Sequence, residues 1–163
     1  MEVKAKHVYT QSAETVFKSF GNKDVMTNRF IAMGGRNIQI EVCKLTKTSM
    51  DMRVSREVPS EVPTLLKRVM NEWNQATQEE HWTGSPSKGY TGDLKITFKG
   101  VPVTITGTLF LANEGSGSAN TMTFTFKSGI PLIGKKLAEF VGKAVEVEMQ
   151  REYEFIRDAL NSK

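Results

Sequence analysis

The chain has 163 residues, of which 39% are hydrophobic and 25% charged, and its net charge is +4. Its length suits a single domain over residues 1–163, and its composition is that of an ordinary globular protein. No apolar run approaches the roughly 18 residues that cross a bilayer, and no block of like charges suggests an arm that binds nucleic acid. The first ten residues lack the apolar block of a signal peptide. Because Cys43 is the only cysteine, no internal disulfide can form, and we expect a cytoplasmic protein.

The N-terminal part is predicted to form one strand and two short helices. Residues 2–11 alternate polar and apolar types, which is typical of a strand. A helix is expected next, because Ser12 suits the N-cap position, Glu14 lies in the first turn where the helix dipole favours an anion, and Gly21 suits the end. A second short helix is expected over about residues 24–31.

From about residue 38 to residue 128 the hydrophobic pattern changes to period two, which predicts consecutive strands with one apolar and one polar face. The segment 73–83 is also read as a strand, although Trp73 and Trp82 fall on opposite parities. A sheet with one wet face is antiparallel, since parallel sheets are covered on both sides. Short turns between the strands make a meander. We therefore expect a curved antiparallel sheet of about seven strands, because a twisted sheet of this size curls.

A long C-terminal helix is predicted from Pro131, which can begin a helix without losing a needed donor, to about Leu160. Its apolar residues fall on one broad face, and at 1.5 Å per residue it is on the order of 40 Å long. This face must be buried, and the dry face of the sheet is the only uncommitted apolar surface. Because the sheet curls, sheet and helix need not touch everywhere, and we expect a cavity between them.

The residues expected to line this cavity are those that face the gap from either side. They are Met52, Arg56, Tyr90, Leu94, Ile96, Phe98, Leu109, Phe124, Phe126, Leu137, Phe140, Val141 and Glu148. Glu148 lies on the midline of the apolar helix face, and Arg56 shares the strand parity of Met52. A buried carboxylate needs a partner or a raised pKa, so Arg56 could meet Glu148 or a polar group of a ligand. The alternative is that the helix diverges from the sheet and leaves Glu148 in solvent.

One end of the sheet is expected to form the mouth of the cavity. In a meander, alternate connections share one end, so residues 57–72, the turn at 100–102 and the junction 128–131 should lie together. A short amphipathic lid is predicted from the helical spacing of Leu65, Leu66, Val69 and Met70. The same end carries basic residues, which are Lys67, Arg68, Lys99, Lys127, Lys135 and Lys136. Aliphatic residues ringed by lysine suit peripheral contact with an anionic membrane or access for an amphipathic acid. The alternative is that these residues only keep the protein soluble.

No metal or cofactor is expected, because His7, His81 and Cys43 have no ligand spacing and Cys43 falls on the wet side of its strand. His81 lies beside Glu79 and Glu80, which could suggest an acid–base pair. A cross-strand ion pair on the sheet surface is the favoured interpretation, since adjacent strand residues point to opposite faces.

The order of strand, two short helices, six strands and long helix resembles the START-like, or Bet v 1-like (SRPBCC), helix-grip superfamily, and within it an uncharacterised bacterial branch. The opening strand into residues 12–17, the strand 52–56, and the segments 80–82, 103–109 and 130–137 carry the resemblance. It implies an α+β helix-grip fold with the long helix packed on the concave face of the sheet. The superfamily includes lipid-transfer domains, hormone receptors, polyketide cyclases and chaperone activators, so the fold does not determine the function.

The expected function is therefore non-catalytic binding or transfer of a hydrophobic or lipid-like small molecule. One alternative is an enzyme of the cyclase or hydrolase type in the same cavity, which a dense polar cluster inside the cavity would favour. The other is a protein-interaction module of the chaperone-activator kind, which a closed, fully packed interior with an exposed apolar patch would favour.

Overall fold

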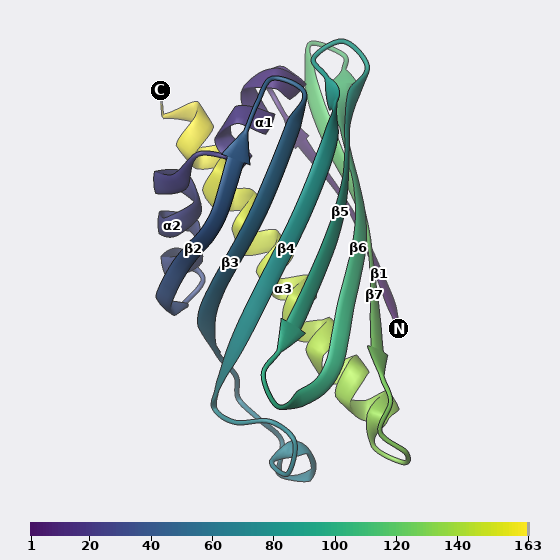
Figure 1. The fold of residues 1–163 in the computed structure, drawn as a ribbon. Helices are drawn as coiled ribbons and strands as arrows, with labels where there is room; N and C mark the ends of the chain where they lie inside the picture. Colours follow the sequence, from purple (N-terminus) through teal and green to yellow (C-terminus); the bar gives the residue numbers. More distant parts are fainter. Residues whose placement is uncertain (163) are drawn as a thin grey trace.

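The computed structural model describes residues 1–162 and shows a curved antiparallel sheet that holds one long helix against its concave face (Figure 1). The 7-stranded sheet has the order β1-β7-β6-β5-β4-β3-β2. Successive strands from β2 to β7 are therefore neighbours, as expected for a meander, and β1 pairs antiparallel with β7 at the far edge. This is the α+β architecture predicted from the sequence.

The elements follow the predicted order closely. The strands are β1 (Glu2–Tyr9), β2 (Arg36–Leu45), β3 (Ser49–Pro59), β4 (Trp73–Ser85), β5 (Gly89–Phe98), β6 (Val101–Glu114) and β7 (Gly117–Ser128). The helices are α1 (Ala13–Phe20), α2 (Lys23–Ala32) and α3 (Gly134–Asn161), and η1 (Thr64–Leu66) is one 3-10 turn. The segment 73–83 is thus a strand, and its two tryptophans lie on opposite faces, with Trp82 buried and Trp73 exposed.

The short helices α1 and α2 cover one end of the concave face. The Ser12 hydroxyl accepts a hydrogen bond from the Thr15 backbone N–H at 3.3 Å, and Asn22 caps α2 in the same way. The ring of Phe17 on α1 stacks on Tyr90 of β5 with 3.8 Å between the ring centroids. Figure 1 shows α1 at the end of the sheet where the β2–β3 turn lies. Both short helices are thus fixed by local caps and by packing on the sheet.

The long helix α3 has 28 residues, which corresponds to about 42 Å at 1.5 Å per residue. It runs along the concave face (Figure 1). Its buried residues are Gly134, Leu137, Ala138, Val141, Gly142, Met149, Ile156 and Leu160. No helix within residues 1–162 is long and apolar enough to cross a membrane.

The start of α3 differs from the prediction, because the helix begins at Gly134 rather than at Pro131. Leu132 has a φ of 69° and is 99% exposed. A residue in this left-handed conformation cannot be part of a right-handed helix, so residues 131–133 form a turn. This turn projects an apolar side chain into solvent.

The segment predicted to form a short amphipathic lid is mostly loop. Residues 60–72 contain only η1, although Leu66 and Met70 are buried and Leu65 is half exposed. The Ser60 N–H donates to the Glu72 carbonyl at 2.7 Å, so the segment is a closed loop of about a dozen residues. Isolated helices this short are marginal in water, and Pro63 supplies no capping side chain.

The strand β2 places Cys43 differently from the prediction. Its register with β3 shifts between Ile40 and Val42, and such a bulge moves the following side chains to the other face. Cys43 is therefore partly buried, and its thiol donates to the Gly21 carbonyl at 3.3 Å. Simple alternation from Ile40 onward cannot anticipate this change.

Candidate functional site

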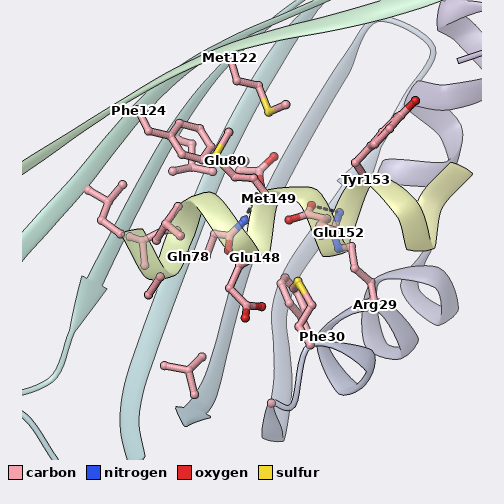
Figure 2. A pocket seen from close by; sticks show the side chains of 18 of the residues that line it. Arg29, Phe30, Gln78, Glu80, Met122, Phe124, Glu148, Met149, Glu152 and Tyr153 are labelled. Atoms are coloured by element: carbon pink, nitrogen blue, oxygen red, sulfur yellow. Dashed lines mark hydrogen bonds and ion pairs between the residues drawn. The ribbon is translucent and has the colours of Figure 1, made fainter. Parts of the chain in front are cut away.

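A cavity of about 180 Å³ lies between the concave face of the sheet and α3. Figure 2 shows side chains from the strands and from α3 that point into it, with Phe30 of α2 at one side. The twisted sheet curves away from the straight helix, so their side chains do not fill the whole space. The cavity predicted from the sequence is therefore present at the expected place.

Most of the cavity wall is apolar. Every second residue of the central strands faces inward, and α3 contributes residues three or four positions apart. The principal apolar lining residues are Leu94, Ile96, Phe98, Leu109, Met122, Phe124, Phe140, Val141, Val145, Met149 and Ile156. A mostly apolar wall suits a small molecule with a large apolar part.

A chain of hydrogen-bonded polar side chains crosses one wall of the cavity. Arg56 Nη2 donates to Gln78 Oε1 at 3.0 Å, and Gln78 Nε2 donates to Glu80 Oε1 at 2.6 Å. The Trp82 indole N–H donates to the other Glu80 oxygen at 2.7 Å. Gln78, Glu80 and Trp82 are alternate residues of β4, so strand geometry places all three on the concave face. Figure 2 shows Gln78 and Glu80 behind α3.

A second polar group joins α2 and α3 at the side of the cavity. Arg29, only 4% exposed, forms an ion pair with Glu152 at 3.0 Å (Figure 2). On the other side of α3, Tyr153 stacks on His7 with 4.5 Å between centroids, and its hydroxyl donates to the Val8 carbonyl at 2.6 Å. These contacts fix α3 relative to α2 and β1.

Burial shifts the pKa of several cavity groups. It raises the pKa of the Glu80 carboxyl, which favours the neutral acid. It also raises the pKa of Glu148, although Arg151 opposes the shift. Burial lowers the pKa of Arg56 to about 10, so this side chain remains a cation at neutral pH. Burial lowers the pKa of His7, against the opposing charge of Glu152.

The predicted cavity residues divide into two groups. Those that line the cavity are Arg56, Leu94, Ile96, Phe98, Leu109, Phe124, Phe140, Val141 and Glu148. The remaining ones belong to the packed core: Met52 lies in a cluster with Phe30 under α2, Tyr90 stacks on Phe17, and Phe126 and Leu137 are fully buried. Strand parity identifies the inner face, but it cannot tell which part of that face a helix covers.

Arg56 and Glu148 both line the cavity, yet they do not form an ion pair. Glu148 lies at its edge, with a side chain 38% accessible and an oxygen 3.4 Å from Arg151. The sequence offered two positions for Glu148, one beside Arg56 in the cavity and one in solvent. The structure shows an intermediate position, because Glu148 lines the cavity edge without pairing with Arg56.

The predicted mouth residues lie together at one end of the molecule. Figure 1 shows η1, the β5–β6 turn and the connection into α3 at the same end. Of the predicted lid residues only Met70 lines the cavity, whereas Leu65, Leu66 and Val69 do not. The basic residues of this end are exposed, namely Lys67, Arg68, Lys99, Lys127, Lys135 and Lys136. None of them forms an ion pair with a carboxylate within residues 1–162.

Sequence reasoning placed Arg56 and Glu148 in the cavity but missed four other polar lining residues, namely Gln78, Glu80, Arg29 and Glu152. Gln78 and Glu80 share the parity of the buried Trp82, and this alternation was the available signal, but polar residues on a strand suggest the wet face. No local signal marks Arg29 and Glu152 as a buried pair. His81 was interpreted correctly, since it is exposed and pairs with Asp51 across β3 and β4. Within residues 1–162, no group of three His, Cys, Asp or Glu side chains could hold a metal ion.

Solved structures share this fold over nearly their whole length. TTHA0849 from Thermus thermophilus matches with a TM-score of 0.69 at 14% identity, covering 99% of this chain and 98% of that chain. Ara h 8.0201 matches with a TM-score of 0.64 at 12% identity, covering 100% and 99%. The Zhui aromatase/cyclase from Streptomyces sp. R1128 matches with a TM-score of 0.60 at 13% identity, covering 98% and 92%. The helix-grip fold implied by the sequence resemblance is therefore confirmed.

Comparison with protein families gives one further finding. The model of a family described as a protein of unknown function, DUF2505, matches residues 4–160. A comparison with curated proteins finds no match. The family therefore covers the strands, the cavity and almost all of α3, while its description assigns no activity to them.

Proposed function

The chain belongs to the DUF2505 family of proteins of unknown function. Because the family assigns no activity, the function has to be argued from the cavity. We propose that the protein binds a hydrophobic small molecule between the sheet and α3, as a carrier or sensor without catalysis. The observation that carries the proposal is the apolar cavity itself. Each Å² of apolar surface that a ligand removes from water contributes about 25 cal/mol, and the apolar side chains of this cavity offer such a surface.

A cavity-filling substitution with a matched control tests this function. Val145 lines the cavity from α3, whereas Val147 on the same helix is 53% exposed. With Nile red as a neutral apolar probe, we expect one-to-one binding to the wild-type protein and an affinity at least tenfold lower in Val145→Trp. Val147→Trp adds the same side chain outside the cavity and should bind as the wild type does. Fluorescence titration measures both affinities, and thermal melts check that both variants fold.

The proposal is contradicted if the wild-type protein does not bind the probe, or if Val145→Trp binds it as well as the wild type. Where the probe does bind, native mass spectrometry of protein purified from its own host identifies the natural molecule, because a ligand with a slow off-rate stays bound through purification.

The polar cluster is the observation that favours the enzymatic alternative. Glu80, with a raised pKa, is the candidate proton donor for such an enzyme. Binding remains the better-supported function, because both Glu80 oxygens already accept hydrogen bonds from Gln78 and Trp82 and most of the wall is apolar. The cavity also argues against the protein-interaction alternative, which a closed and fully packed interior would favour.

We also propose that the end bearing η1 and the turn before α3 contacts an anionic membrane. Leu132 is 99% exposed in a left-handed conformation, and Leu65, in the loop at the same end of the molecule (Figure 1), is 49% exposed. Burying a leucine side chain contributes about 1.5–3 kcal/mol, and each basic residue near an anionic surface contributes about 1 kcal/mol. Glu61 and Glu72 on the same loop reduce this attraction without cancelling it.

Co-sedimentation with vesicles tests this contact. We expect the protein to bind vesicles of phosphatidylserine and phosphatidylcholine better than phosphatidylcholine alone, and to dissociate as salt rises, because exposed charges are screened over about 8–10 Å. Charge reversal to glutamate at Lys67, Arg68, Lys135 and Lys136 should abolish binding without unfolding the protein.

The matched control reverses four exposed lysines elsewhere, namely Lys44, Lys47, Lys88 and Lys95, and should keep binding to the anionic vesicles. Equal loss in both sets of variants means that net charge alone acts. Equal binding to both vesicle types, or to neither, means that this end has no membrane role.

A further inference from the structure

The least satisfied charge in the cavity is that of Arg56. This side chain is 9% exposed and lines the cavity from β3. Its Nη2 has one acceptor, Gln78 Oε1 at 3.0 Å, and its guanidinium carbon lies 4.0 Å from the centroid of the Phe30 ring. Its Nη1 is buried and has no hydrogen-bond partner within residues 1–162. Arg56 is thus a buried cation that contacts the Gln78 amide and the face of the Phe30 ring. Within residues 1–162 it forms no ion pair with a carboxylate.

The three carboxylates around Arg56 are engaged elsewhere. Glu152 forms its ion pair with Arg29 at 3.0 Å. Glu80 accepts hydrogen bonds from Gln78 and Trp82 on its two oxygens, and burial favours its neutral form. Glu148 lies at the cavity edge beside Arg151. Because none of the three is within ion-pair distance, the positive charge of Arg56 has no direct counter-ion in the described residues.

A buried charge without a counter-ion is unfavourable, because it loses hydration that nothing replaces. An anionic group brought in by a ligand would meet this charge and supply an acceptor for Nη1, and hydrogen bonds between ionised groups are stronger than neutral ones. We propose that the ligand of this cavity is an amphipathic acid, an apolar body bearing a carboxylate, and that Arg56 is the counter-ion of that carboxylate. This inference rests on the proposed function, because it specifies the chemical class of molecule that the same cavity binds.

The apolar part of such a ligand has a defined place. Leu94, Ile96, Leu109 and Phe124 line the cavity on β5, β6 and β7, the strands beyond Gln78 and Glu80 of β4, and Val141 lines it from α3. A carboxylate at Arg56 therefore leaves the rest of the molecule against an apolar wall. The wall accommodates either an acyl chain or an aromatic ring system, since burial of apolar surface is non-directional.

Acid and alcohol pairs test this inference by displacement of Nile red. Dodecanoate and dodecan-1-ol represent the acyl chain, and 1-naphthoate and 1-naphthalenemethanol represent the aromatic body. For at least one pair, we expect the acid to bind the wild-type protein at least tenfold more tightly than its alcohol. The pair that shows this preference indicates whether the apolar part of the ligand is an acyl chain or an aromatic ring system. Arg56→Met should remove the preference by weakening the acid at least tenfold while leaving the alcohol within about twofold.

Two further variants keep the test decisive if Arg56→Met folds poorly. Glu148→Gln removes a negative charge that acts on Arg56, so the affinity for the acid should rise about threefold or more, with the alcohol unchanged. Arg53→Met is the matched control, because Arg53 lies on the outer side of β3 and pairs with Glu41 and Glu79. This variant should bind acid and alcohol as the wild type does.

The inference is overturned if both alcohols bind as tightly as their acids, if the preference survives in a folded Arg56→Met variant, or if Glu148→Gln weakens acid binding. In these cases binding of Nile red still supports a hydrophobic ligand in the cavity. If neither the acids, the alcohols nor Nile red bind, the inference and the proposed function fail together.

Discussion

The Phe17→Ala variant is expected to lose about 3–5 kcal/mol of the free energy of unfolding. Phe17 is 1% exposed, its ring stacks on Tyr90, and it meets Trp82 edge-on with 6.0 Å between centroids. These rings come from α1, β5 and β4, and a helix on a sheet cannot close the space that a missing ring leaves. Urea unfolding measures the loss, and in a thermal melt it corresponds to a fall in Tm on the order of 10 °C.

The matched control for this variant is Phe110→Ala, since Phe110 on β6 is 46% exposed. Surface substitutions away from special features usually change stability by no more than about 0.5 kcal/mol. A loss below about 1 kcal/mol for Phe17→Ala, or equal losses in both variants, would show that α1 does not pack on the sheet as described.

The Glu152→Gln variant is expected to lose about 2 kcal/mol of the free energy of unfolding. The substitution keeps the size of the side chain but leaves the charge of Arg29, which is 4% exposed, without its partner at 3.0 Å. Breaking a buried pair from one side costs about 3–5 kcal/mol, and an exposed pair contributes about 0–1 kcal/mol. Because the Glu152 side chain is 33% accessible, the expected loss of stability lies between the values for a buried pair and an exposed pair. Chemical denaturation of both proteins measures it.

A double variant separates the charge effect from general damage to α3. Arg29→Met combined with Glu152→Leu removes both charges, and replacing a buried pair by apolar residues is often neutral. It should therefore be more stable than Glu152→Gln alone. Glu146→Gln on the exposed side of α3 is the control and should change stability little. If the double variant is as unstable as the single one, the unpaired charge of Arg29 is not the cause.

Much of the fold follows from local patterns in the chain. The alternation on β3, β5, β6 and β7 predicted which residues face inward, because side chains of a strand point to opposite faces in turn. Ser12 and Gly21 marked α1, since capping involves residues within one turn of each other. The same reasoning placed Arg56 on the inner face and Glu148 on the inward side of α3. It failed at β2, where a bulge changes the parity between Ile40 and Val42.

The partners of the polar side chains in the cavity were decided only by the tertiary structure. The pairing of Arg29 with Glu152 joins two helices that lie far apart in the chain. Gln78 and Glu80 face the cavity because Trp82, on the same side of β4, is drawn into the core.

The sequence by itself determined the order of the elements, the antiparallel sheet and the existence of an inner face that the long helix covers. These features depend on hydrophobic periodicity, which is written into neighbouring residues. The tertiary structure decided where helix and sheet separate, which inward residues line the space between them, and why Arg56 has no direct ion-pair partner in the described chain. These features depend on curvature and on contacts between distant segments, and periodicity within one segment carries no information about either.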